Sequence, residues 1–269
     1  MKNFSPGVID YEGRMAASYH AGRALSNEAA GTWSSVLAPF VEHAEFIRVL
    51  DLGSGTGRFA TLFARSFAIQ VIAVEPSTKM LDVAASGERQ SNLAYVAGAA
   101  ERIPLRSESC DLVWLSHVWH HIQDRQTCAS ELRRIVRRGG HVLVRGTFGD
   151  QLDGFPTLFR YWPSTRAICQ QLPTIQETVL VFEESGFLLT EHRRVEQITA
   201  RSLCEFAKRT YLRADTALTL LSDSEFQQGQ AAIEKSAAEE PAAMPVIETI
   251  ELLVFCQNSI RPVDRPGHR

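Results

Sequence analysis

The chain of 269 residues carries 28 basic and 31 acidic side chains, a formal net charge of −3 at pH 7. A chain of this length can bury one substantial core, so we expect one α/β domain with inserted pieces rather than two independent domains. The weak negative charge gives no general attraction for nucleic acid. The five cysteines fit neither a disulfide framework nor a zinc site, so no metal is expected. We find no membrane-spanning run and no signal-peptide pattern, which predicts a cytoplasmic protein.

Strand and helix patterns alternate through the first half of the chain. Residues 10–45 predict helices, which we take as an amino-terminal helical cap over residues 1–45. The main domain, residues 46–269, begins with strands near 47–52, 70–75, 93–97 and 110–116 and helices near 57–66, 77–86 and 124–137. A fifth strand, residues 141–147, follows a glycine pair. This alternation predicts a parallel sheet with helices on both faces.

The pattern becomes irregular after the fifth strand. The segment 155–163 is aromatic and broken by prolines, so we interpret it as part of a lid at about 148–173 rather than as a core helix. Later elements are expected as a helix at 174–185, a strand at 187–197, mostly helical residues at 202–239 and a last strand at 248–256. We therefore expect an α/β fold with a Rossmann-like sheet of seven mostly parallel strands. A second lid insertion is expected at about 200–245, and a loose tail at 261–269.

The most informative stretch joins a buried strand to a helix through alternating glycines. It reads V-L-D-L-G-S-G-T-G and begins at Val49. Glycine has no Cβ and tolerates positive φ, so the peptide groups of Gly53, Ser54 and Gly55 can approach a nucleoside-like ligand closely. A second apolar strand ends in Glu75, 22 residues after Gly53. An acid at this offset is placed to bind ribose hydroxyls.

A nicotinamide or flavin dinucleotide site is the obvious alternative for such a loop. The dinucleotide fingerprint needs a third glycine where Arg58 stands here, because helix and strand must pack closely. The pattern present is G-x-G-x-G. With the strand that ends in an acid, it resembles motif I of the class I S-adenosylmethionine-dependent methyltransferases, over about residues 45–147. The resemblance implies S-adenosyl-L-methionine as the cofactor and a small molecule as the methyl acceptor.

The resemblance also implies roles for individual residues. Asp51 would hold the loop and the amino-acid end of the cofactor, and Glu75 would bind both ribose hydroxyls. Met80 would pack on adenine, unless it is a core methionine. In the amino-terminal helix, Tyr19 would close over the cofactor and Arg23 would meet its carboxylate, unless Arg23 is a surface residue. The implied cofactor-binding residues are Tyr19, Arg23, Asp51, Gly53, Ser54, Gly55, Glu75, Pro76, Met80, Ala100, Glu101 and Ser116.

One position departs from the family pattern at the adenine end. The segment V-A-G-A-A-E-R-I-P, which begins at Val96, resembles the family's G-D-A-E-x-L-P. The acid that usually accepts from the adenine amino group is replaced by Ala99. The backbone at Ala100 can still recognise the ring, and Glu101 either compensates or is solvated.

Two adjacent histidines follow the fourth strand, which ends at Ser116. The resemblance places the Ser116 backbone beside the cofactor and His120 and His121 on the acceptor side. An imidazole with a pKa near neutrality can take a proton from an acceptor hydroxyl or acidic carbon, so we expect one of the two to be the catalytic base. The alternative is a polar wall that only shapes the pocket. The aromatic segment 155–163 favours an apolar or planar acceptor, although it could equally form a homodimer contact.

These observations predict methyl transfer to a hydroxyl or carbon of a small molecule, in secondary metabolism. Two other functions stay open: methyl transfer to RNA or another macromolecule, and cofactor binding without transfer. The arginines at 133, 134, 137 and 138 do not favour nucleic acid, because they are expected at a helix end, where cations meet the negative end of the helix dipole.

Overall fold

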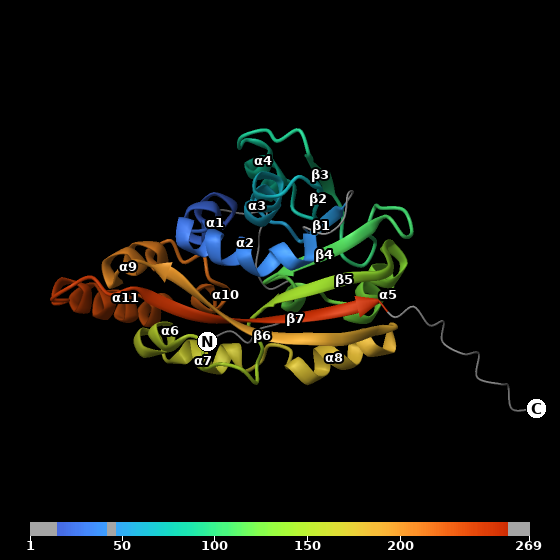
Figure 1. Cartoon of the computed structure of the whole chain (residues 1–269). Coiled ribbons are helices and arrows are strands. Elements are labelled where there is room, and N and C mark those ends of the chain that lie inside the picture. The colour runs from blue at the N-terminus through green and yellow to red at the C-terminus, as the bar shows by residue number, and fades with distance from the viewer. Residues whose placement is uncertain (1–14, 42–46, 258–269) are drawn as a thin grey trace, which may run out of the picture.

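The structure is a computed structural model that describes residues 15–41 and 47–257. The helical pattern expected before residue 15 and at 42–45, and the tail expected at 261–269, lie outside the described residues. Through both described ranges, strands and helices alternate as the sequence predicts (Figure 1). Every helix in these ranges is too short or too polar to span a bilayer.

Seven strands form one sheet in the described part of the chain, in the order β3-β2-β1-β4-β5-β7-β6. They are β1 (Arg48–Leu52), β2 (Gln70–Glu75), β3 (Leu93–Ala97), β4 (Cys110–Ser116), β5 (Val136–Gly146), β6 (Phe187–Ala200) and β7 (Val246–Gln257). The first five strands pair in parallel, and β7 runs antiparallel between β5 and β6. The apolar central strands β1 and β4 are buried, as a sheet covered on both faces requires. The expected seven-stranded, mostly parallel sheet is confirmed.

Helices cover both faces of the sheet. They are α1 (Met15–Arg23), α2 (Asn27–Val41), α3 (Arg58–Ser66), α4 (Thr78–Ala85), α5 (Arg125–Ile135), α6 (Pro156–Tyr161), α7 (Ser164–Cys169), α8 (Ile175–Glu184), α9 (Leu203–Tyr211), α10 (Thr216–Thr219) and α11 (Asp223–Ala238), with a 3-10 turn η1 (Trp119–His121). On one face, Trp33 of α2 and Phe59 of α3 pack on Trp114 of β4, with centroids 5.6 and 5.0 Å from it. On the other, Phe182 of α8 stacks on Phe255 of β7 at 4.0 Å.

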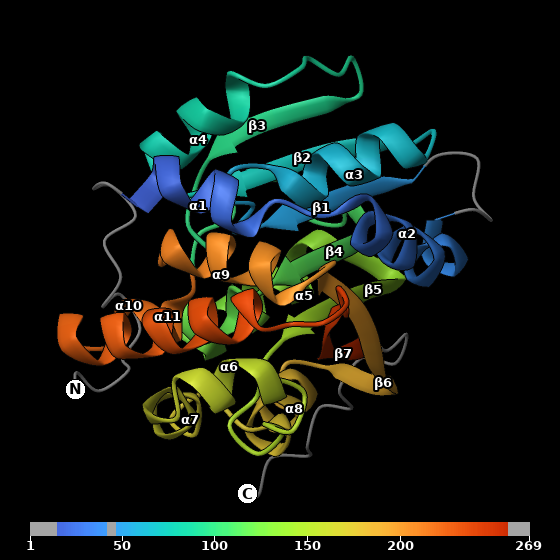
Figure 2. The ribbon, with the colours of Figure 1, turned by 90° about the vertical axis from the view of Figure 1, so that its left-hand side faces the viewer.

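A group of helices stands at the carboxyl edge of the parallel strands (Figure 2). From here on, the cap means α1, α6, α7, α9, α10 and α11; it excludes α2, which packs on a face of the sheet. Within it, α9 packs against α1 and α11, α6 against α7 and α11, and α10 against α7. Side-chain caps fix where two of these helices begin: Ser202 accepts the Glu205 N–H at α9, and Ser222 forms a capping box with Glu225 at α11. The cap helices after β5 fall within the segments that the sequence indicates as insertions.

The segment 155–163 differs from the sequence-based expectation of an irregular lid. It contains helix α6, and Trp162 at its end is only 2% exposed. The Trp162 indole N–H donates to the Phe226 carbonyl at 3.0 Å, so this segment belongs to the core. Pro156 stands in the first turn of α6, where backbone N–H groups have no partner within the helix, so the N–H that proline lacks is not needed.

The arginines that follow α5 also differ from expectation. Val136 directly after α5 pairs with Cys110 in the sheet, so the helix ends earlier than the sequence predicts. Arg137 and Arg138 therefore lie on β5 and not at a helix end. Arg137 instead donates to Asp111 of β4 at 2.8 Å. This ion pair joins the neighbouring strands β4 and β5.

Candidate active site

Loops that follow neighbouring strands meet at one edge of the sheet. The register pairs Glu75 with Ala97 and Ser116 with Arg145, so β2 ends beside β3 and β4 ends beside β5. Between them, β1 ends at Leu52, next to both β2 and β4. Parallel strands that end together place their loops around one crevice, which is the usual ligand site of such a sheet.

The three glycines after β1 have φ angles of 68°, 56° and 76°, in the left-handed region. A Cβ on Gly53 would lie 2.2 Å from a Val118 methyl carbon, and one on Gly57 would also collide with a neighbouring side chain. A Cβ on Gly55 would meet only Tyr19 Cε1, at 3.7 Å. Packing within the protein therefore requires Gly53 and Gly57, whereas Gly55 keeps a face open beneath Tyr19.

Glu75, at the end of β2, is tied to the glycine loop. Its carboxylate accepts the Gly55 N–H at 2.8 Å and the Ser77 N–H at 3.0 Å, and the residue is 7% exposed. These charge-assisted bonds fix the direction of both carboxylate oxygens. Since a carboxylate has about four acceptor positions, Glu75 can order the loop and also accept from ligand hydroxyls.

Two buried oxygens under the glycine loop, Asp51 Oδ2 and Ser54 Oγ, have no hydrogen-bond partner among the described residues. Burial raises the pKa of Asp51 to about 7, against the opposing effects of the Ala60 N–H and the Arg58 charge. A buried polar atom without a partner costs about 1–3 kcal/mol. A ligand that donates an N–H or O–H here would remove this cost.

The other expected cofactor residues lie on the loops after β2 and β3. Pro76 is exposed, and Met80 in α4 is 1% exposed, so the thioether is enclosed by protein. Ala100 is half-buried against the core cluster beside β4. The pKa of the Cys128 thiol in α5 is raised, chiefly by burial and next by the charge of Glu101. Glu101 therefore lies close to α5.

A cavity of about 900 Å³, part of it open to solvent, lies between this edge and the cap. Tyr19 and Arg23 of α1 line it, as do His120 and His121 of η1. Other charged and polar wall residues are Arg58, His117, Arg145, Gln197, Arg209, Asp215 and Glu248. The glycines and Glu75 are not part of this wall, so the cavity adjoins the glycine loop through Arg58 and Tyr19.

The wall is more polar than the sequence indicates. Of the aromatic residues expected to meet an apolar acceptor, Phe155 lines the cavity, whereas Tyr161 and Trp162 are buried in the core. Four arginines stand beside apolar wall residues such as Leu25, Ile168 and Ile250. The wall is therefore mixed, and an apolar or planar acceptor stays a prediction.

The paired histidines lie against each other on the cavity wall. His120 is 7% exposed, and its ring centroid is 4.1 Å from that of His121. Burial lowers the pKa of His120 well below 6.5 and that of His121 to about 4. The expected pKa near neutrality is wrong for both, because the sequence does not show how deeply they are buried. Both imidazoles are neutral at pH 7 and remain able to accept a proton.

His117 is a third histidine of the wall, which the sequence analysis missed. It follows Ser116 directly and has a φ of 54°, a strained value for a residue with a side chain. Burial lowers its pKa well below 6.5, and the charge of Arg145 acts in the same direction. Its place directly after a strand of the site is the signal that could have identified it.

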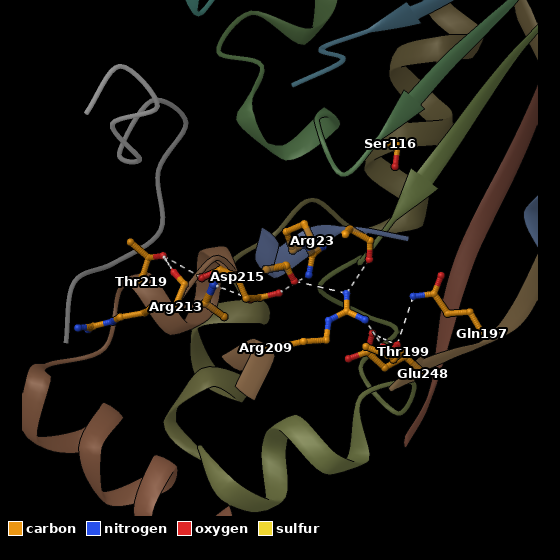
Figure 3. Close-up of polar contacts among 12 residues, drawn as sticks. Arg23, Ser116, Gln197, Thr199, Arg209, Arg213, Asp215, Thr219 and Glu248 are labelled. Atoms are coloured by element: carbon orange, nitrogen blue, oxygen red, sulfur yellow. Dashed lines mark hydrogen bonds and ion pairs between the residues drawn. The ribbon is translucent and has the colours of Figure 1, made fainter. Parts of the chain in front are cut away.

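The carboxyl end of α1 is held by arginines from two other elements. Arg58 of α3 donates to the Arg23 carbonyl at 2.7 Å. Arg209 of α9 donates to the Ala24 carbonyl at 3.0 Å and lies beside Arg23 (Figure 3). The Arg23 side chain donates to Asp215 at 3.0 Å. The last carbonyls of a helix have no partner within it, so these cations fix α1 beside the cavity.

Arg145 of β5 is a buried charge that the sequence analysis also missed. It is 2% exposed and donates to Ser116 Oγ at 3.0 Å and to Gln197 Oε1 at 2.8 Å. Its guanidinium carbon lies 4.5 Å from the centre of the Trp33 ring. The available signal was an arginine inside the apolar strand run H-V-L-V-R-G. Among the described residues, no group of three or more His, Cys, Asp or Glu is placed to hold a metal ion.

Comparisons with known proteins agree with this geometry. Residues 50–144 match the family described as methyltransferase domain. An uncharacterized methyltransferase of Mycobacterium bovis is 38% identical over 106 residues, which are 39% of this chain and 42% of the relative. The chain thus spans less than half the length of this relative.

Solved structures resemble the chain over most of its length. A protein named as a methyltransferase from an antibiotic biosynthesis pathway of Anabaena variabilis matches with a TM-score of 0.68 and 15% identity, over 83% of this chain and 96% of its own. A phosphoethanolamine N-methyltransferase of Haemonchus contortus, in complex with phosphomonomethylethanolamine and S-adenosylhomocysteine, matches with a TM-score of 0.60 and 19% identity, over 94% of this chain and 61% of its own. Such identities show the fold alone. Residues 50–144, which contain the glycine loop, Glu75 and Ser116, are therefore a methyltransferase domain by sequence, and the chain has the fold of solved methyltransferases.

Proposed function

We propose that this protein transfers a methyl group from S-adenosylmethionine to a hydroxyl or carbon of a small molecule held in the cavity. The observation that carries the proposal is the junction of a glycine loop, tied to Glu75, with a histidine-lined cavity. A cavity partly closed by a helical cap suits a small molecule better than RNA or a protein surface. The Anabaena neighbour belongs to an antibiotic pathway, which supports a role in secondary metabolism.

The residues at the edge fit this cofactor. Glu75 can accept from the ribose hydroxyls, and the unpaired oxygens of Asp51 and Ser54 can accept from an amino group. Gly55 leaves its face open to the ligand. Tyr19, Arg23, Pro76, Met80, Ala100, Glu101 and the Ser116 backbone are proposed as further contacts. When bound, S-adenosylmethionine supplies a methyl group on a positively charged sulfur, and the sulfur keeps the electron pair of the broken bond.

The protein contributes alignment and a base. His120 or His121, neutral at pH 7, takes the proton from an acceptor hydroxyl or acidic carbon. The cap encloses the cavity and limits the access of water to it. Alignment of the two reacting atoms supplies most of the rate in such a displacement.

Calorimetric titration with S-adenosylhomocysteine tests the cofactor site. Glu75→Ala removes the carboxylate that orders Gly55 and accepts from ribose, so we expect binding to weaken by roughly 2–4 kcal/mol, or about 30- to 1,000-fold. Glu184→Ala, an exposed acid on α8, is the matched control and should bind like the parent protein. NADH should not bind. Unchanged affinity in Glu75→Ala would mean that the site is misplaced.

Transfer itself is followed with a methyl-labelled cofactor offered together with a small-molecule extract, bulk RNA and bulk protein. We expect label in the small-molecule fraction. Label in RNA or protein would favour the macromolecular alternative. Cofactor binding with no labelled product in any fraction would favour a binding protein without transfer activity.

A further inference from the structure

Arg145 is a buried cation without a carboxylate partner in the described part of the chain. It is 2% exposed, and the side chains that bind its terminal nitrogens, Ser116 and Gln197, are both neutral. Its Nε has no hydrogen-bond partner. Buried arginines are normally paired, because removing a guanidinium from water costs several kcal/mol when no anion compensates.

The surroundings of Arg145 hold it in one orientation. Gln197 Oε1 accepts from Arg145 Nη2 and from Trp33 Nε1, both at 2.8 Å. The guanidinium carbon lies 4.5 Å from the Trp33 ring centre and 5.1 Å from that of Phe59. A planar fork fixed between rings and hydrogen bonds is preorganised for a planar anion. An apolar side chain would fill the same space at lower cost.

The whole wall carries more positive than negative charge, with four arginines against two carboxylates. Of the four arginines, Arg23 is paired with Asp215. Arg58 and Arg209 donate to carbonyls at the end of α1, where the negative end of the helix dipole lies. Glu248 accepts from the Thr199 hydroxyl at 2.8 Å, and burial raises its pKa. Arg145 is the only one of the four that is fully buried, and it has neither a carboxylate nor a helix end to offset its charge among the described residues.

We propose that Arg145 binds a carboxylate of the methyl acceptor, so that the substrate is a small carboxylic acid with a methylatable hydroxyl or carbon. Arg145 and His120 line the same cavity, so an acceptor anchored by its carboxylate is held in the cavity that contains the candidate base. This inference rests on the proposed function. The cofactor's own carboxylate has the same chemistry, and the experiment separates the two sources.

Acetate is the smallest probe of such a site, and acetamide is its uncharged counterpart. Thermal unfolding of the full chain is measured with each probe at matched ionic strength, with and without saturating S-adenosylhomocysteine. The variants are Arg145→Met and, as a matched control, Arg193→Met on β6, which is not part of the cavity wall. At ten times its Kd, acetate should raise the Tm of the parent by about 3 °C, and acetamide should not. The effect should persist with S-adenosylhomocysteine bound, disappear in Arg145→Met and remain in Arg193→Met.

Two results would overturn the proposal. Equal effects of acetate and acetamide on the parent protein would exclude an anion site, and this comparison does not depend on the folding of any variant. The second result has two parts: the acetate effect is lost when S-adenosylhomocysteine is added, and Arg145→Met binds S-adenosylhomocysteine at least tenfold more weakly than the parent does. Together they would assign Arg145 to the cofactor carboxylate. If S-adenosylhomocysteine does not bind the parent at all, the proposed function fails, while the acetate comparison still reports on Arg145.

Discussion

At the scale of single residues, burial sets the chemistry of the cavity. The neutral state of His120 and His121 follows from loss of water around the rings, and each is thereby ready to accept a proton. A base with a low pKa drives proton transfer less strongly, but it is unprotonated over a wide pH range. Its activity should therefore reflect position more than pH.

Replacement of the paired histidines tests this interpretation. One of the two variants, His120→Ala or His121→Ala, should lack the base. In that variant we expect turnover to fall by roughly 10²- to 10⁴-fold, with little change in cofactor affinity. Because burial lowers the pKa of His121 to about 4 and that of His120 well below 6.5, the acid limb of the parent's rate profile should lie well below pH 6.5. Labelled-methyl assays from pH 4 to 9 measure both effects, with His20→Ala on the exposed side of α1 as the control. Near-parent turnover in both variants would leave alignment as the source of catalysis, as for an amine acceptor.

At the scale of elements, α1 depends on its neighbours. It has nine residues, and an isolated helix of that length is not stable in water. Its order comes from packing against α4 and α9 and from the arginines that bind its last carbonyls. Since Tyr19 and Arg23 lie on this helix, the closure of the cavity depends on contacts made with α3 and α9.

Hydrogen exchange can show whether these contacts hold α1 in place. Arg209→Ala removes the donor to the Ala24 carbonyl, so amides of residues 15–23 should exchange at least tenfold faster, while those of β1 and β4 stay protected. Arg201→Ala is the matched control, because this exposed arginine precedes the same helix and pairs with Glu205. Unchanged exchange in α1 would show that its packing suffices without the arginine.

At the scale of the whole molecule, buried ionisable groups make stability depend on pH. His117, His120 and His121 have folded pKa values below the usual 6.5, so their contribution is complete above pH 6.5 and is lost as pH falls toward 4. Asp51 acts in the opposite direction, because its pKa rises from 3.8 to about 7 on folding. Its contribution is complete below pH 3.8 and is lost as pH rises to 7. The histidines outnumber it, so the free energy of unfolding should fall on acidification from pH 6.5 to 5, with each net proton contributing up to about 1.4 kcal/mol per pH unit.

Asp51→Asn isolates the opposing contribution. Relative to the parent, this variant should gain about 2 kcal/mol between pH 5 and pH 8, because it removes a carboxylate that is costly to ionise in the folded state. Urea unfolding at pH 5, 6.5 and 8 measures the difference. A constant offset between the two proteins at all three pH values would contradict a raised pKa for Asp51.

Local patterns in the sequence account for the parts of the fold that could be predicted. Apolar runs, glycines and hydroxyl caps act within a few residues, so the strands, the glycine loop and the acid at Glu75 were found. The cavity wall depends on contacts between distant segments, such as Arg23 with Asp215, 192 positions apart. Segment 155–163 was misjudged because proline begins helices as well as breaking them. Burial, which sets the pKa of His120, is a property of the assembled cap.

The chain draws its two ligand surfaces from different stretches of sequence. The loops proposed to hold the cofactor lie between β1 and the end of β4, inside residues 50–144, the part that matches the family. Arg145, Gln197 and most of the cavity wall lie after it. Under the proposed function, mutations in the later stretch would change which acceptor is recognised and leave the glycine loop and Glu75 unaltered. Exchanging the segment after β5 between related enzymes would then transfer acceptor preference without transferring the cofactor loops.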